Sequence, residues 1–130
     1  MKVGVVCGAF HRSEVERMLS EVEVRAASHG VTIAHVVWVP GAFEVPLACQ
    51  RLLQAGMEGV VTLGIIEKGQ TQHGLVIGRA VADALIELQL QHGRPIGLGI
   101  IGPGVTPDQV EARLLPHAAA ALEAVVAMLR

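Results

Sequence analysis

Four short runs of apolar residues, spread along the chain, constrain its possible folds more than any other feature. They cover approximately residues 2–7, 32–39, 59–66 and 95–101, and few polar residues interrupt them. A strand with one face in water alternates apolar and polar residues, whereas a strand covered on both faces reads as a nearly continuous apolar run. We therefore predict four strands of a parallel sheet that carries helices on both faces.

The segments between these runs have the spacing of amphipathic helices. After the first run, apolar residues recur at intervals of three and four from Val15 to Ala26, and Gly30 ends the segment. Ser13 and Glu16 have the spacing of a capping box at its start. We predict further helices over residues 46–53 and 73–91.

The last helix carries the clearest start signal in the chain. Thr106 is followed by Pro107 and, two residues later, by Gln109, which gives a cap, a proline at the first helical position and a glutamine three residues after the cap. We expect this helix to run to the C-terminal end, with a break at Pro116.

Strands and helices are thus expected to alternate along all 130 residues, a length that suits one domain over residues 1–130. Such alternation predicts an α/β fold, a three-layer α/β/α sandwich around a four-stranded parallel sheet. Ligands of such sheets bind beyond the carboxyl ends of the strands. The turns expected at that edge comprise residues 8–11, 40–44, 67–73 and 102–106.

The composition is apolar for a domain of this size, with 52% hydrophobic and 17% charged residues. No uninterrupted apolar stretch approaches the ~18 residues of a membrane span, so no membrane partner is expected. The first residues also lack the layout of a signal peptide. Contact between subunits is the simplest place for the surplus apolar surface, so we expect a homo-oligomer.

The charged, aromatic and sulfur-containing residues exclude further classes of protein. A net charge of −2, no basic block, one Trp, two Phe and no Tyr give little support to a nucleic-acid partner. Cys7 and Cys49 lie in apolar stretches and have neither metal-ligand nor disulfide-framework spacing. We expect buried reduced thiols, a cytoplasmic location and no metal site.

The turn after the third run, EKGQTQHG at residues 67–74, has the features of a phosphate site. Gly69 permits a tight turn, Thr71 offers a hydroxyl near a helix N-terminus, and Lys68 adds positive charge. His73 follows in the first turn of the helix. The alternative interpretation is an ordinary helix cap with a histidine on the surface, because an isolated Gly-x-Thr is a weak signal.

The turn after the second run, VPGAFEVP at residues 39–46, places the carboxylate of Glu44 near another helix N-terminus. Its negative charge could simply stabilise the helix by about 0.3–1 kcal/mol, through interaction with the helix dipole. Alternatively, Glu44 and the backbone around it bind a polyhydroxyl chain. Phe10, in the first turn, could stack on a flat ring or merely pack. The neighbouring His11 is a further candidate for ligand contact.

Taken together, these turns resemble the lumazine synthase family. The resemblance rests on AFH at residues 9–11, VPGAFEVP at 39–46, LGIIEKGQTQH at 63–73 and QVEAR at 109–113. It implies a flavodoxin-like fold and an enzyme of riboflavin biosynthesis, a transferase that uses no metal or organic cofactor. It also implies a homopentamer, or a multiple of pentamers, with each site between adjacent subunits.

The reaction that the resemblance implies joins 5-amino-6-(D-ribitylamino)uracil to 3,4-dihydroxy-2-butanone 4-phosphate. The product is 6,7-dimethyl-8-ribityllumazine, and phosphate and water leave. In this scheme Phe10 stacks on the pyrimidine, His73 moves protons, and Arg113 reaches the phosphate from the neighbouring subunit. The other implied contacts are Ala42, Phe43 and Glu44 for the ribityl chain, the backbone of Ile65, Ile66 and Glu67 for the pyrimidine edge, and Gln70 and Thr71 for the phosphate.

The sequence also departs from the family pattern. Leu98 stands where the family has an aromatic residue that a neighbouring subunit places over the pyrimidine. Glu67 replaces an apolar residue, and the segment after Arg113 lacks the usual loop with lysine and glycine. These departures leave open a non-catalytic oligomer that binds ribityl-pyrimidines or flavins. An archaeal-type riboflavin synthase is a third alternative, which the G-x-T-x-H turn disfavours.

Overall fold

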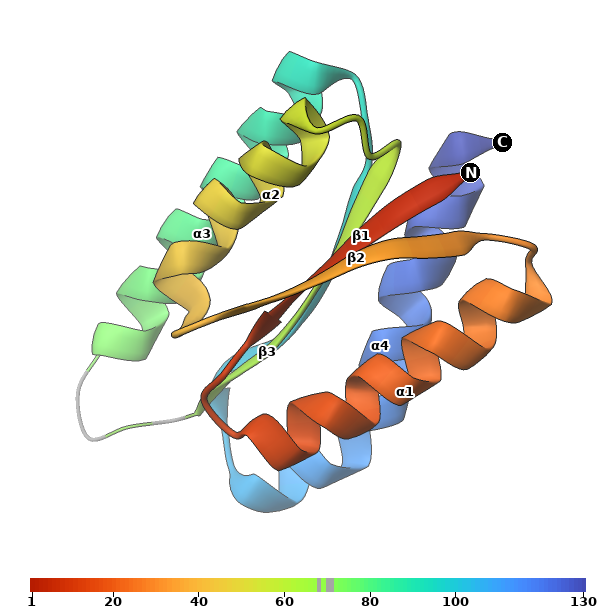
Figure 1. Cartoon of the computed structure of the whole chain (residues 1–130). Coiled ribbons are helices and arrows are strands. Elements are labelled where there is room, and N and C mark those ends of the chain that lie inside the picture. The colour runs from red at the N-terminus through yellow and green to blue at the C-terminus, as the bar shows by residue number, and fades with distance from the viewer. Residues whose placement is uncertain (68, 70–71) are drawn as a thin grey trace.

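A sheet with helices on both faces forms the fold of the computed structural model, which describes residues 1–67, 69 and 72–130 (Figure 1). Strands and helices alternate along the chain, as predicted. In chain order the elements are β1 (Lys2–Gly8), α1 (Arg12–Ser28), β2 (Thr32–Val39), the 3-10 helix η1 (Ala42–Glu44), α2 (Val45–Gln54), β3 (Gly59–Glu67), α3 (His73–His92), β4 (Ile96–Val105) and α4 (Pro107–Leu129).

The strands of the sheet are all parallel and lie in the order β2-β1-β3-β4. Helices α2 and α3 cover one face, and α1 and α4 cover the other (Figure 1). This arrangement confirms the three-layer, flavodoxin-like α/β/α sandwich. Because the strands are parallel, their carboxyl ends meet at one edge of the sheet, where the turns that follow β1, β2 and β3 also meet.

Side chains of the central strands alternate between two apolar cores. Val5 and Leu63 belong to the core beneath α1 and α4, and Val6 and Val60 belong to the core beneath α2 and α3. Thr62 is the exception, a fully buried polar residue whose hydroxyl donates a hydrogen bond to the Gly97 carbonyl at 2.9 Å. The nearly continuous apolar runs of β1 and β3 therefore reflect burial on both faces.

Strand β2 departs from the expectation that every strand is buried on both faces. It lies at the edge of the sheet, and His35 and Val36 are exposed, with Val36 at 40%. The apolar run predicted a strand correctly, but its burial within this chain was overestimated. An apolar strand at an open edge is a surface that can pair with or pack against another chain.

The start of α1 differs from the predicted capping box. The helix begins at Arg12, and its cap is His11, a left-handed residue with φ 58°. Ser13 therefore lies inside the first turn, where its hydroxyl donates to the Glu14 carboxylate at 3.0 Å. The capping-box prediction was wrong because the helix begins at Arg12, two residues earlier than a cap at Ser13 would place its start.

The start of α4 matches its prediction, but the expected break does not occur. The Gln109 N–H donates to the Thr106 hydroxyl at 3.4 Å, and the Thr106 N–H donates to the Gln109 side chain at 3.0 Å. The helix then continues through the exposed Pro116 to Leu129. Leu114 and Ala118, on either side of the proline, are fully buried, so packing holds this segment helical.

Among the described residues, α4 is the helix whose length and composition would allow it to cross a membrane, with a mean hydropathy of 1.4. One face of α4 packs into the core with Leu114, Leu122 and Val125, each fully buried. One face of this apolar helix therefore belongs to the core of the domain.

Candidate active site

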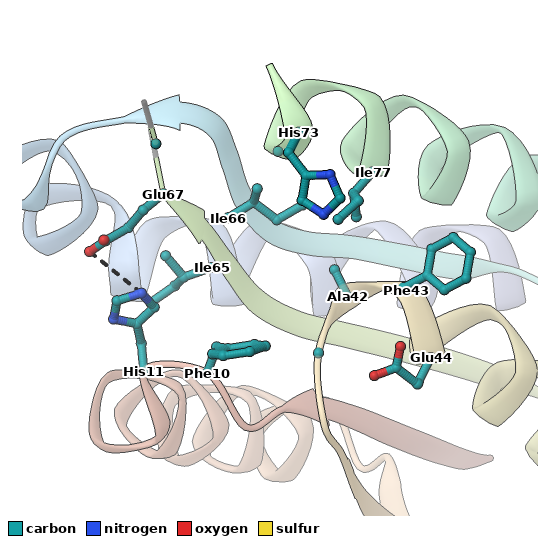
Figure 2. Close-up of a pocket in the computed structure, with 13 residues that line it drawn as sticks. Phe10, His11, Ala42, Phe43, Glu44, Ile65, Ile66, Glu67, His73 and Ile77 are labelled. Carbon is teal, nitrogen blue, oxygen red and sulfur yellow. Dashed lines mark ion pairs between the residues drawn. The ribbon is translucent and has the colours of Figure 1, made fainter. Parts of the chain in front are cut away.

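A cavity of about 510 Å³ opens at the carboxyl ends of β1, β2 and β3 (Figure 2). This is the edge at which the alternating pattern predicted a ligand. The cavity is bounded by the turn before α1, by η1, by the end of β3 and by the first turn of α3. Its lining residues are Phe10, His11, Gly41, Ala42, Phe43, Glu44, Ile65, Ile66, Glu67, Gly69, His73, Gly74 and Ile77.

The wall that follows β1 presents an aromatic ring. Phe10 is 68% exposed, although it is a large apolar residue. A backbone hydrogen bond from Ala9 N–H to the Val39 carbonyl, 2.8 Å long, ties this turn to the end of β2. The ring of Phe10 lies near Gly41, where an added Cβ would stand 3.0 Å from Cε2 of the ring, a tight contact. An exposed ring held in this way offers a flat surface for stacking.

The wall that follows β2 is formed by η1, which the sequence did not predict. Ala42 and Phe43 line the cavity there, and Phe43 is 69% exposed. Glu44 is the cap residue of α2, yet its side chain makes no capping hydrogen bond. Figure 2 shows its carboxylate beside the cavity, below Phe43. Glu44 thus lies both at the N-terminus of α2, where its charge interacts with the helix dipole, and in the lining of the cavity.

The wall formed by β3 and α3 is closely packed. Gly74, in the first turn of α3, lies so near the end of β3 that an added Cβ would stand 3.1 Å from Cγ2 of Ile66. This approach brings His73 to the cavity, on the same face of α3 as Ile77 (Figure 2). The sequence reasoning missed Gly74 and Ile77. The i, i+4 spacing from His73 to Ile77 could have identified the isoleucine.

The fourth side of the cavity holds an ion pair. Nε2 of His11 lies 3.5 Å from Oε1 of Glu67, and the two side chains are 34% and 39% exposed (Figure 2). With Glu44 and His73, they are the titratable groups among the described lining residues. Two imidazoles and two carboxylates around a mainly apolar slot are groups that can hold and transfer protons.

The structure brings most of the predicted site residues to this cavity. Phe10, Ala42, Phe43, Glu44, Ile65, Ile66, Glu67 and His73 all line it. The predicted phosphate contacts Gln70 and Thr71, like Lys68, lie outside the described residues. The described residues contain no group of three or more His, Cys, Asp or Glu side chains that could hold a metal ion.

Two predicted residues lie elsewhere on the chain. Leu98, on β4, is 54% exposed and lines a separate groove with Leu75 and Arg79. Arg113 lines a third hollow with Gln109 and His117, beside the start of α4. Neither residue lines the cavity of its own chain.

Fold and cavity together define an α/β protein with a preformed ligand site at the carboxyl edge of a parallel sheet. The family model for 6,7-dimethyl-8-ribityllumazine synthase matches residues 1–130. The chain belongs to this family.

Individual relatives agree with the family model. The chain is 38% identical to the 6,7-dimethyl-8-ribityllumazine synthase of Staphylothermus marinus, over 98% of this chain and 86% of the relative. The enzyme of Metallosphaera sedula is 37% identical, over 100% of this chain and 87% of the relative. That of Methanoculleus marisnigri is 35% identical, over 100% and 96%.

Among solved structures, the fold is similar to a protein described as "Split gene transketolase, inactive beta4 tetramer". The TM-score is 0.51 at 20% identity, and the match covers 99% of this chain and 40% of that chain. At this identity the similarity shows a shared fold alone.

Proposed function

We propose that the chain condenses 5-amino-6-(D-ribitylamino)uracil with 3,4-dihydroxy-2-butanone 4-phosphate to form 6,7-dimethyl-8-ribityllumazine. Membership of the family and the relatives named above support this reaction. The observation that carries it is the meeting of Phe10, Glu44 and His73 at one cavity, although they come from three different turns. An aromatic surface, an acceptor for hydroxyl groups and a proton-transfer group are what this condensation requires.

Binding of the pyrimidine follows from the shape of the cavity. The pyrimidine ring stacks on Phe10, and the edge of this ring meets the backbone at Ile65 and Ile66, at the end of β3. Its ribityl chain extends toward Phe43 and Glu44, where a carboxylate can accept hydrogen bonds from several hydroxyl groups. The ring and the sugar alcohol thus occupy different parts of a cavity that is already formed.

The chemistry then depends mainly on placement. The amine of the pyrimidine and the carbonyl of the ketone react readily once they are held together, and such orientation contributes a large part of many rate accelerations. Imine formation, loss of phosphate and ring closure each move protons. His73, at the cavity wall, transfers them, because an imidazole can both donate and accept a proton near neutral pH.

Completion of the site by a second subunit explains the positions of Arg113 and Leu98. In a homopentamer or a multiple of pentamers, Arg113 of one subunit binds the phosphorylated ketone at the cavity of the next, and Leu98 covers the pyrimidine. The exposed apolar residues Leu98, Ile86 and Leu90, at 54%, 56% and 80%, favour such an assembly.

No observation favours the non-catalytic alternative over the enzyme. The exposed Glu67 side chain leaves the backbone at the end of β3 in place, and Phe10 supplies a stacking surface without Leu98. The family match likewise names the lumazine synthase reaction and no riboflavin synthase.

The test is an assay with both substrates and the purified chain. Because the substrates also react without a catalyst, the rate in buffer alone is subtracted. We expect lumazine fluorescence to appear in proportion to protein concentration and to saturate with each substrate. A rate no higher than that of buffer would overturn the proposal, even if the protein binds lumazine or flavin.

A further inference from the structure

The His11–Glu67 ion pair lies at the end of the cavity away from Phe43 and Glu44 (Figure 2). The two side chains come from different segments, the turn between β1 and α1 and the last residue of β3. Neither is required by the reaction steps given above. Their position beside the ring of Phe10 raises the question of what the pair contributes.

The pair joins the two walls of the pyrimidine slot beyond the point where the sheet does so. Backbone pairing between β1 and β3 ends with Cys7 opposite Leu63. Phe10 lies past this point in the turn after β1, and Ile65 and Ile66 lie past it on β3. A side-chain link at this end therefore acts on the spacing between the aromatic ring and the backbone that faces it.

Both partners are anchored through their backbones. Glu67 pairs with Val105 of the neighbouring strand β4, although the register shifts just before it. His11 caps α1 in the left-handed conformation, and its carbonyl accepts a hydrogen bond from Val15 N–H at 3.0 Å. The ion pair thus links two anchored segments, and Phe10 directly precedes one of its partners, His11, in the turn between β1 and α1.

We infer that His11 and Glu67 are positioning residues, which hold Phe10 at the distance from the end of β3 that a flat pyrimidine or lumazine ring requires. This inference rests on the proposed function for the identity of the ring. It concerns only the ring end of the cavity, so the phosphorylated ketone should be affected little.

The size of the effect follows from the exposure of the pair. Partly exposed ion pairs contribute about 0.2–1 kcal/mol, which corresponds to a change in affinity of about 1.4- to fivefold, and this pair carries both charges only when His11 is protonated. We therefore expect loss of either partner to weaken ring binding by about 1.4- to fivefold, with kcat for the bound substrates nearly unchanged.

Two single variants and their combination test the inference. Glu67→Gln keeps the shape of the side chain and removes its charge. His11→Asn keeps a residue that tolerates the left-handed conformation but is too short to reach Glu67. Glu123→Gln is the matched control, because Glu123 pairs with His29 at 2.8 Å beyond the other end of α1.

The measurements are the Kd of 6,7-dimethyl-8-ribityllumazine, from its fluorescence, and the KM values of both substrates. We expect each single variant to raise the lumazine Kd and the pyrimidine KM by about 1.4- to fivefold. The double variant should raise these two values no more than either single variant does, because the effects of removing both partners of one interaction are not additive. The control variant should have the same lumazine Kd and the same KM values as the unmodified chain.

Several results would overturn the inference. These are unchanged lumazine binding in both single variants, additive effects in the double variant, an equal effect of Glu123→Gln, or a rise confined to the ketone KM. If the unmodified chain binds lumazine without forming it, the proposed function fails while the lumazine Kd still decides the inference. If it binds no lumazine, both are overturned.

Discussion

The ring of Phe10 lies close to Gly41 in the lining of the cavity: a Cβ at position 41 would stand 3.0 Å from Cε2 and 3.1 Å from Cδ2 of the phenylalanine. Gly41 has φ −161°, an extended conformation that other residues adopt without strain. Space, and not backbone conformation, therefore favours glycine here, because the ring of Phe10 would have to move by a few tenths of an ångström to admit a Cβ. The VPGAFEVP turn contributes to the stacking surface by leaving room for a ring from another turn.

Gly41→Ala should consequently displace Phe10 and weaken pyrimidine binding. Stacking of a base on an aromatic side chain contributes about 1–3 kcal/mol, and partial displacement should cost about 1 kcal/mol of it. Titration with lumazine measures this loss. Gly8→Ala is the matched control, because its Cβ would meet atoms at 3.8 Å, an ordinary contact distance. Equal affinities of the two variants would contradict the role given to Gly41.

His73→Ala should lower kcat while leaving the native mass of the particle unchanged. Proton transfer by a positioned side chain typically contributes about 10²–10⁴-fold, and we expect a loss near the lower limit because both substrates are reactive. His92→Ala, at the other end of α3, is the control and should retain full activity. Loss of assembly in His73→Ala, with no separable effect on kcat, would make the histidine structural.

Arg113→Ala should raise the KM of the phosphorylated ketone more than that of the pyrimidine. The guanidinium suits a phosphate because it donates hydrogen bonds from a planar, permanently charged group. Equal increases for both substrates would contradict this role.

Mixed particles test whether Arg113 acts on a neighbouring subunit. Co-assembly of His73→Ala and Arg113→Ala chains should restore part of the activity, because some sites then combine the intact His73 of one chain with the intact Arg113 of another. Activity no higher than the average of the two variants would place both residues in one subunit's site.

Thr62→Val should destabilise the protein without changing the cavity. The fully buried hydroxyl donates to Gly97 and accepts from Gly99 N–H at 3.4 Å, so valine leaves buried backbone groups without this partner. We expect the free energy of unfolding to fall by about 1–3 kcal/mol, measured with denaturant at equal protomer concentration. Thr32→Val, at the exposed start of β2, should change it by less than about 0.5 kcal/mol.

Burial raises the pKa of the Cys7 and Cys49 thiols from 9.0 to about 12. Both should therefore resist alkylation at pH 8 in the native protein and react after unfolding. Below pH 9 folded and unfolded chains hold these protons equally. Between about pH 9 and 12 the folded chain holds more, so the free energy of unfolding should fall as pH rises through this window. Rapid alkylation of the native protein would contradict the burial of the thiols.

Much of the fold was predictable because short sequence patterns indicate which strands are buried and where helices are capped. The apolar runs of β1 and β3 and the Thr106 cap of α4 all match the structure. The open edge at β2 was not predictable in this way. An apolar strand has the same sequence pattern whether it is buried within its own chain or exposed at an edge where another chain can pack.

The site was partly predictable for a related reason. Turns at the carboxyl ends of parallel strands converge, so Phe10, Glu44 and His73 were expected to lie together. The contacts between turns were not predictable, because they depend on how closely the segments approach. Gly41 beside Phe10 and Glu67 beside His11 are such contacts, and no local pattern marks either of them.

A crystal structure of the protein with bound 6,7-dimethyl-8-ribityllumazine tests the central claim most directly. We predict that the fused ring stacks on Phe10 with its edge at Ile65 and Ile66, that the ribityl chain reaches Glu44, and that His73 lies beside the newly formed ring. Lumazine bound elsewhere on the chain, or bound here with its ribityl chain directed away from Glu44, would contradict it.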